Sequence, residues 1–362
     1  MKEKFFLAAL LAMNATARAQ SSVSLFGSID VGMTYVSNQN GHAVVKFDDG
    51  IFSPNLIVLR GNEGLGSGAS VLFELSSQFS PGTGEFIGSG IFGRTAFLGL
   101  HNDRFGTLTL GYQYDFMYDV LLLGGDDSAR DVAGLYNFRN GPFQKLALPD
   151  NPTGAFDWDR VGATQRVPDA VKYVSPSVDG MTFGALYGLR DPDSATGLES
   201  TQSFGVSYGS GNFGVGAAYT NQRYTSVAGS PASTITNFGT GAHYATDELT
   251  TSVLFTSVRN SASGATAWMI EVGTTRHLTQ ALILGVDYLY MKGNARVDDN
   301  HAHQIDASLQ YALSKQTTVY VSGVYQRASS GAHAQIDGVL DPDGASSSPT
   351  QVIAHLGVHT AF

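Results

Sequence analysis

The chain has 362 residues, no cysteine, only 14% charged residues and a formal net charge of −10 at pH 7. The absence of cysteine excludes disulfides and thiolate chemistry, and the acidic balance argues against nucleic acid as a partner. No uninterrupted apolar run after residue 19 approaches 18 residues, which excludes helical membrane spans.

The first nineteen residues have the features of a secretory signal peptide. Lys2 and Lys4 form a cationic tip, a short apolar run follows, and Ala17-Arg18-Ala19 fits the small-x-small cleavage pattern. We predict that residues 1–19 are removed and that residues 20–362 form one domain. Removing three basic residues and one acidic residue changes the net charge from −10 to −12.

Alternation of apolar and polar residues begins directly after this segment. Every second residue from Val23 to Tyr35 is apolar or glycine, and the opposite face carries Ser24, Asp30 and Thr34. A stretch of that length crosses a membrane as a tilted strand, with one side suited to lipid and the other to water.

The same period predicts sixteen strands. They cover residues 23–35, 55–63, 69–79, 92–101, 106–115, 168–176, 180–189, 201–209, 212–223, 234–246, 249–259, 266–277, 281–292, 302–314, 317–328 and 350–362. Short links such as 102–105 and 246–248 alternate with longer links rich in Gly, Ser, Asn and Asp. Turns at one end and loops at the other are typical of a membrane barrel. We therefore predict an all-β fold, a 16-stranded antiparallel transmembrane β-barrel.

One connection differs from the others. Residues 116–168 show no clear period, although alternating segments at 106–115 and 169–175 flank them. A structureless connection of that length inside a compact domain is either functional or a sign of a wrong assignment. We predict that residues 116–165, approximately, fold into the lumen as a constriction loop.

Several segments resemble the general porins of Gram-negative outer membranes, most closely the betaproteobacterial branch. They are Ser22–Asp30, Leu59–Gly66, Phe92–Leu100, Gly106–Asp115, Val171–Pro176 and the terminal Phe362. The resemblance implies a homotrimer in outer-membrane lipid, each barrel being a water-filled channel for passive diffusion of ions and small hydrophilic solutes, without a cofactor. It also implies that Phe362 is the signal read by the barrel assembly machinery, and that an inward loop presents acidic groups to a basic wall.

Strand phase identifies candidates for that basic wall. If Phe97 faces lipid, Arg94 faces the lumen; outward Val171 and Leu59 likewise place their neighbours Lys172 and Arg60 inside. An arginine on the lipid face would cost about 2–4 kcal/mol near the midplane. The candidates are Arg60, Arg94, Arg166 and Lys172, of which Arg94 and Arg166 best match the pore-wall arginines of the family.

Candidates for the acidic side are Asp115, Asp119, Asp126, Asp127 and Asp131. Opposed charges in a narrow gap create a transverse field that orders water and orients dipolar solutes; the alternative is that most of these aspartates are simply solvated loop residues.

The chain also departs from the family pattern. Leu56 stands where a wall arginine is common, Tyr112 replaces an arginine after the fifth strand, and residues 359–361 lack the usual basic groups. We therefore do not extend anion selectivity to this chain. Together with Leu121–Leu123, these residues leave open a substrate-selective channel for a partly apolar or aromatic solute.

Other classes fit less well. A hydrolase needs a His beside a Ser or Asp with an orienting group, and the nine histidines are scattered. His301 and His303, in a predicted loop with Asp298 and Asp299, lack a third metal ligand of defined spacing. We predict neither an enzyme nor a metal site. A structural barrel with a sealed lumen is a further alternative that the sequence does not exclude, although a long charged loop in the lumen argues against it.

Overall fold

The computed structural model describes residues 21–88, 90–124, 138, 157–189, 197–226, 231–337 and 341–362. The predicted signal peptide and the candidates Asp126, Asp127 and Asp131 lie outside these residues. The strands are β1 (Ser21–Gln39), β2 (His42–Asp49), β3 (Leu56–Gly66), β4 (Ala69–Phe79), β5 (Phe86–Ile87), β6 (Thr95–Asn102), β7 (Gly106–Gln113), β8 (Val167–Val174), β9 (Met181–Gly188), β10 (Leu198–Ser210), β11 (Phe213–Tyr224), β12 (Ser233–Ala245), β13 (Leu249–Asn260), β14 (Thr266–His277), β15 (Leu282–Gly293), β16 (His301–Ala312), β17 (Thr317–Ala328) and β18 (Thr350–Ala361).

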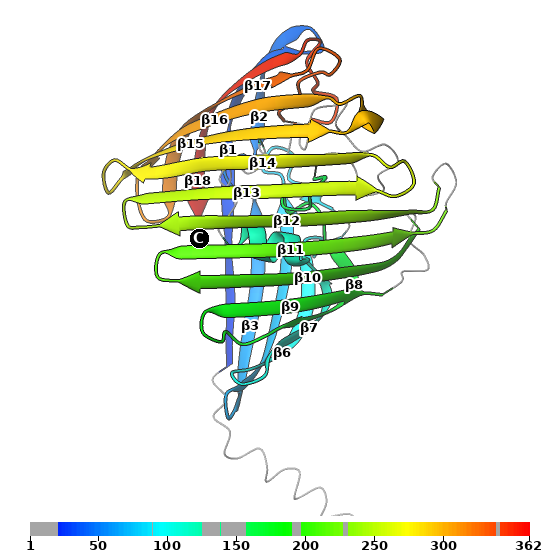
Figure 1. The fold of residues 1–362 in the computed structure, drawn as a ribbon. Helices are drawn as coiled ribbons and strands as arrows, with labels where there is room; N and C mark the ends of the chain where they lie inside the picture. The colour runs from blue at the N-terminus through cyan, green and yellow to red at the C-terminus, as the bar shows by residue number, and fades with distance from the viewer. Residues whose placement is uncertain are drawn as a thin grey trace, which may run out of the picture.

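These strands form a closed antiparallel barrel with sixteen positions in its wall, as predicted. Each wall strand pairs with the next along the chain, and β18 pairs with β1 through Ser28–Val36, which closes the sheet. Figure 1 shows β10–β17 crossing the near wall and β1, β3, β6 and β7 the far wall. Closure leaves no unpaired strand edge in the membrane.

Two short strands, β2 and β5, were not predicted from the sequence. One edge of the long strand β1 pairs with β3 through Ser21–Ser28 and with β2 through Val31–Gln39, so β2 occupies no separate wall position. A two-residue turn at Asn40 and Gly41 connects β1 to β2, with positive φ values of 51° and 95°. Asn-Gly is the strongest short hairpin signal, so this strand could have been found.

The predicted alternation corresponds to two chemically different surfaces. In β16, Gln304, Asp306 and Ser308 are buried, whereas Ile305 and Leu309 are exposed. Apolar residues therefore face outward and polar residues face the interior, which is the arrangement a barrel needs in lipid. No helix among the described residues is long and apolar enough to cross a membrane.

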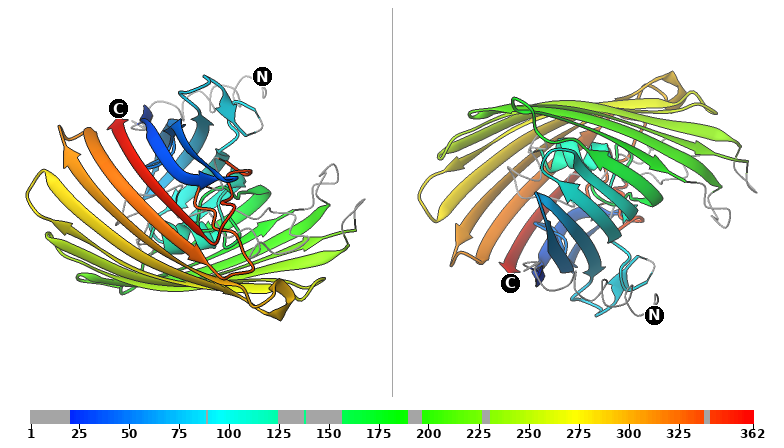
Figure 2. Two further views of the ribbon diagram at one scale, coloured as in Figure 1. Left: turned by 90° about the horizontal axis from the view of Figure 1, so that it is seen from above. Right: turned by 90° about the horizontal axis from the view of Figure 1, so that it is seen from below.

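A short π-helix, η2 (Met117–Leu122), lies inside the barrel and packs against β10, β11 and β12. Figure 2 shows it between the two walls, seen along both directions. Gly184, Gly205 and Gly239 make room for it, because a Cβ at any of them would approach Phe116 or Leu121 within 3 Å. The contact between η2 and the inner wall thus belongs to the larger of two buried apolar clusters in the described part of the chain.

Candidate functional site

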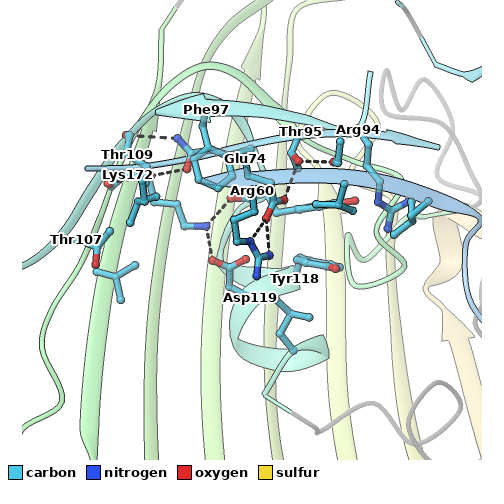
Figure 3. Close-up of a pocket in the computed structure, with 18 of the residues that line it drawn as sticks. Arg60, Glu74, Arg94, Thr95, Phe97, Thr107, Thr109, Tyr118, Asp119 and Lys172 are labelled. Carbon is cyan, nitrogen blue, oxygen red and sulfur yellow. Dashed lines mark hydrogen bonds and ion pairs between the residues drawn. The ribbon is translucent and has the colours of Figure 1, made fainter. Parts of the chain in front are cut away.

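A cavity of about 450 Å³ separates η2 from the wall formed by β3, β4, β6, β7 and β8. Its lining combines three cations, Arg60, Arg94 and Lys172, with two carboxylates, Glu74 and Asp119. Figure 3 shows these side chains converging from the strands and from the helix. Charges of both signs thus face the same space in the barrel interior.

Arg60 and Glu74 form the first charge pair. They are direct partners in the register of β3 and β4, and Arg60 Nε donates to Glu74 Oε2 at 3.0 Å. The other carboxylate oxygen accepts from Thr95 Oγ1 at 2.9 Å. The Arg60 side chain is 60% exposed on the lumen side, so water screens this pair. Glu74 was not predicted, although it shares a strand face with Leu72 and Ser76.

Lys172 and Asp119 form the second charge pair, between β8 and η2. Lys172 Nζ also donates to the carbonyl of Tyr114 at 2.9 Å and lies 5.1 Å from the Phe116 ring centroid. Burial raises the pKa of Asp119, and the nearby ammonium of Lys172 opposes that shift. Lys172 points inward, as strand phase predicted, and it ties the helix to the opposite wall.

Arg94 and Arg166 both lie close to the ring of Tyr114. Their guanidinium carbons are 5.8 Å and 5.0 Å from its ring centroid, and this ring stacks on Tyr118 at 3.8 Å. Arg94 Nη1 donates to Gln78 Oε1 at 2.6 Å. Arg94 lines the cavity, whereas Arg166 is outside its lining. Arginine over a tyrosine face is a favourable cation–π arrangement.

The phase argument for Arg94 started from a wrong premise. Phe97 lines the cavity rather than facing lipid. Arg94 still reaches the lumen because it precedes β6, which begins at Thr95, and alternation does not extend to residues outside a strand.

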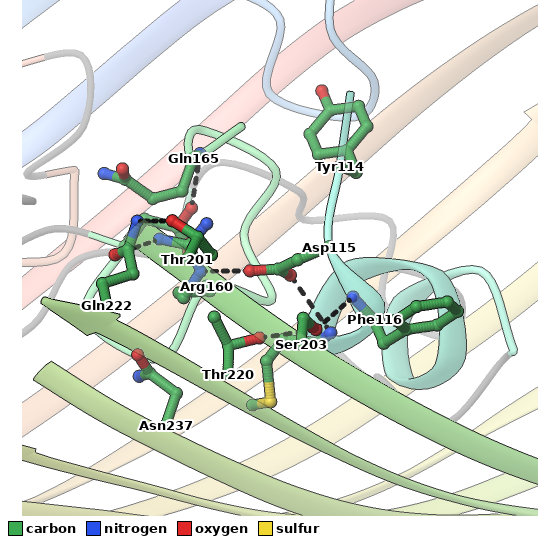
Figure 4. Close-up of polar contacts among 12 residues, drawn as sticks. Tyr114, Asp115, Phe116, Arg160, Gln165, Thr201, Ser203, Thr220, Gln222 and Asn237 are labelled. Carbon is green, nitrogen blue, oxygen red and sulfur yellow. Dashed lines mark hydrogen bonds and ion pairs between the residues drawn. The ribbon is translucent and has the colours of Figure 1, made fainter. Parts of the chain in front are cut away.

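Asp115 is buried just before the start of η2 and does not line the cavity. It forms an ion pair with Arg160, a residue that the sequence did not single out, and both side chains are 1% exposed. Arg160 Nη1 also donates to Gln222 Oε1 of β11 at 2.8 Å. The backbone N–H of Phe116 donates to Ser203 Oγ of β10 at 3.0 Å. Figure 4 shows this network, which fastens both ends of the long connection to the wall.

The three consecutive leucines Leu121–Leu123 differ in burial. Leu121 and Leu122 are buried against the wall, whereas Leu123 is 56% exposed and lines the cavity. Leu56 and the Phe26 ring line it from β3 and β1, but Tyr112 does not.

A second charged cluster lies where the connection from β17 to β18 meets β2. Lys46 Nζ lies 2.8 Å from Asp337, 3.4 Å from Asp341 and 3.5 Å from Asp48. Burial raises the pKa of Asp337 to about 7, against the attraction of Lys46. Phe138 packs beside Ile51 and Ile336, so three connections meet here.

His301 and His303 lie on strand β16 and face outward, not in a loop as predicted. Among the residues that the structure describes, no group of three or more His, Asp or Glu side chains could hold a metal ion.

Comparisons with known proteins agree with this architecture. The chain matches a family model described as Gram-negative porin over residues 7–331. It is 24% identical to outer membrane porin protein 32 of Delftia acidovorans, over 100% of both chains. It is 29% identical to an outer membrane porin protein of Bordetella pertussis over 215 residues, 53% of this chain and 49% of that protein.

Solved structures show the same fold. An anion-selective porin from Comamonas acidovorans superposes with a TM-score of 0.76 at 20% identity, covering 95% of this chain and 100% of that one. The trimer form of OmpT, an outer membrane protein of Vibrio cholerae, gives a TM-score of 0.67 at 15% identity, covering 94% and 99%.

Proposed function

Because the chain belongs to the Gram-negative porin family and is an outer-membrane channel for passive diffusion, we propose that its selectivity is set where η2 faces β3, β4 and β8. The observation that carries this proposal is the cavity between them, lined by cations and carboxylates. Residues 116–165, approximately, act as the constriction loop, and small hydrophilic ions and solutes pass beside it.

The charge arrangement supports a filter for polar solutes. Arg60 and Lys172 each pair with a carboxylate across the lining, while Arg94 adds a further cation. Fixed charges in a narrow space orient water and dipolar solutes, and an apolar solute would have to disrupt that order. Pairing leaves little net charge, so we expect weak ion selectivity. Arg166 acts through Tyr114, and Asp115 holds the loop in place.

The assembled form follows from the same premise. We propose a homotrimer, since a solved relative has a trimer form, and a role for the terminal Phe362 in recognition by the barrel assembly machinery. The backbone of Phe362 pairs with Gly27 through two hydrogen bonds of 3.0 Å. Its ring is exposed.

The test is single-channel recording of the purified, unboiled protein in a planar bilayer under a salt gradient. We expect stepwise ohmic currents in groups of three and a small zero-current potential. No conductance from folded protein would overturn the proposal in favour of a sealed barrel.

A second candidate function is a channel selective for a partly apolar or aromatic solute. The cavity lining favours it, because Phe26, Phe97, Tyr118 and Leu123 lie among the charged groups. Titration of benzoate against chloride current separates the two functions. Saturable block supports the selective channel, and a current that follows bulk conductivity supports the general pore.

A further inference from the structure

The outer face of β15 and β16 carries a cluster of imidazole and phenol groups that lies outside the lumen. His301 and His303 are two residues apart on β16, so both rings project from the same face of the strand. They alternate with the buried Ala302 and Gln304, which places them on the outside of the barrel. His303 is exposed and His301 is partly exposed. His301 begins the strand directly after the connection 294–300, so ions from the surrounding water can reach the pair.

The two histidine rings are close enough to share one metal ion. Their centroids are 6.0 Å apart and their planes cross at 86°. A ring nitrogen ligates a metal at about 2.0–2.1 Å, and the ring itself adds about 1 Å, so an ion held by two imidazoles lies about 3 Å from each centroid. The observed separation is therefore at the upper end of this arrangement. Because exposed side chains change rotamer readily, a small rotation of either ring is enough to bring both nitrogens onto one ion.

Tyr288 of β15 selects the nitrogen of His303 that is available to a ligand. Its hydroxyl oxygen lies 2.7 Å from His303 Nδ1. When the Nδ1–H group donates to this oxygen, Nε2 carries the lone pair that a metal ion needs. Histidines that bind metals almost always have such a partner on their second nitrogen. The ring of Tyr290 packs against both histidines, with centroids 6.3 Å from His301 and 4.8 Å from His303. His303 is thus oriented as a ligand by its neighbours on β15.

The surroundings favour an ion that binds imidazole strongly. In the strand register, Lys292 is the partner of His301 and Arg327 is the partner of His303. These cations repel any dication, and the outward faces of β14–β17 include no Asp or Glu. Ca²⁺ and Mg²⁺ require oxygen ligands, so the pair is unsuited to them. Cu²⁺ binds nitrogen sites most tightly among the divalent first-row ions, and its tetragonal geometry accepts two neighbouring imidazoles.

We propose that His301 and His303 form a binding site for Cu²⁺ on the outer face of the barrel, with Tyr288 as the group that orients His303. Two imidazoles are fewer ligands than a closed structural metal site has. Water therefore completes the coordination sphere, and the ion exchanges with the solution. The site is independent of the proposed selectivity filter, because its residues face away from the lumen.

The probe is CuCl₂, titrated into the purified, folded protein without an affinity tag, in detergent and a buffer that does not chelate copper. The pH is about 7.5, where ordinary imidazole is mostly neutral. Calorimetry measures the affinity and the stoichiometry, and electron paramagnetic resonance reports whether nitrogen ligates the ion. The test variants are His301→Gln, His303→Gln and Tyr288→Phe. The controls are His277→Gln, which removes an exposed imidazole at the far end of β14, and Tyr290→Phe, which removes a hydroxyl group from β15 but keeps the ring.

We expect the native chain to bind one Cu²⁺ with a spectrum that shows nitrogen ligands. Each histidine variant should bind it at least about tenfold more weakly. Tyr288→Phe should also weaken binding by about tenfold, since loss of the partner on a ligand's second nitrogen costs about 10–100-fold in metal affinity. Both control variants should bind as the native chain does. Single-channel conductance should be the same in all variants, which separates this proposal from the proposed selectivity filter.

Equal affinity in the native chain and the histidine variants would overturn the proposal, as would a copper spectrum without nitrogen ligands. An equal loss of affinity in His277→Gln would mean that copper binds to scattered histidines, and this result would overturn it too. If one histidine variant fails to fold, the other histidine variant and Tyr288→Phe still decide. Tyr288→Phe preserves the aromatic packing, so an unchanged affinity in this variant would remove Tyr288 from the site.

Discussion

At the scale of single residues, the cavity is organised by charge pairs whose members come from different elements. Lys172 belongs to β8 and Asp119 to η2, so removing one partner leaves the other facing the lumen. We therefore expect the single charges, rather than the total of acidic and basic residues in the chain, to control which ion is favoured.

Lys172→Met should shift the channel toward cations, because it exposes the charge of Asp119. Asp119→Asn should shift it toward anions. A unit charge 4 Å from an ion in water is worth about 1 kcal/mol, or about fivefold in permeability ratio. The zero-current potential under a salt gradient measures both shifts, and the double variant should return close to the native value. Shifts of the same sign in the two single variants would contradict the pairing.

Arg94→Ala should increase single-channel conductance and shift selectivity toward cations, because it removes both bulk and positive charge from the cavity lining. Arg276→Ala is the matched control, since Arg276 is exposed on the outer face of β14. Unchanged current and unchanged selectivity for Arg94→Ala would show that conduction does not pass this residue.

At the scale of elements, alternation predicted the strands well because lipid and water impose opposite demands on the two faces of one strand. It placed Lys172 correctly because that residue lies inside β8. It misplaced Phe97, because a wide lumen tolerates aromatic residues on its inner face. It could not find the pairing of Asp115 with Arg160, since these residues are 45 positions apart and the ion pair depends on how the long connection folds.

Gly205→Val should loosen η2 from the wall. A Cβ on Gly205 would lie 2.8 Å from Phe116 Cβ, close to the backbone that anchors the helix. Overpacking of this kind costs about 1–3 kcal/mol, so we expect larger and noisier single-channel currents. Gly209→Val on the same strand is the control, because nothing lies within 4 Å of its Cβ position. Identical current noise in the two variants would contradict a wall-held helix.

The connection from β17 to β18 should loosen as pH rises. The pKa of Asp337 is raised from 3.8 to about 7, chiefly by burial, with Lys46 and Asp48 of β2 and its neighbour Asp341 facing it. A raised pKa stabilises the folded connection fully below about pH 4, and this contribution is lost as pH passes 7. Hydrogen exchange of residues 341–349, corrected for intrinsic rate, should therefore be faster at pH 8 than at pH 5. Asp337→Asn should remove the difference, and a native chain without one would refute the assignment.

At the scale of the whole molecule, the barrel is stable only when its first and last strands meet. β1 and β18 are the most distant strands in sequence, yet nine consecutive residue pairs join them, from Ser28 with Ala361 to Val36 with Ile353. In hydrocarbon an unpaired strand edge would leave several backbone groups without hydrogen bonds. Closure is therefore a requirement for a folded channel rather than a late refinement.

Gly27 lies at the end of the closing seam: it pairs with β3 on one edge of β1, and on the other edge its backbone is hydrogen-bonded to Phe362, which makes it the sharpest test of closure. A Cβ there would lie 2.1 Å from the Leu56 carbonyl oxygen and 2.8 Å from Phe362 Cζ. Because a backbone atom cannot move aside as a side chain can, Gly27→Val should force β1 away from β3 beside the closing seam and cost about 3 kcal/mol or more.

We expect Gly27→Val to yield little of the compact species that migrates faster on gels before heating than after it. Gly323→Val is the matched control on β17, since the nearest atom to its Cβ position is 3.9 Å away. It should fold as the native chain does. A normal yield of the compact species from Gly27→Val would contradict this prediction. It would show that the close approach of β1 to β3 and Phe362 can be relieved while β1 and β18 stay paired.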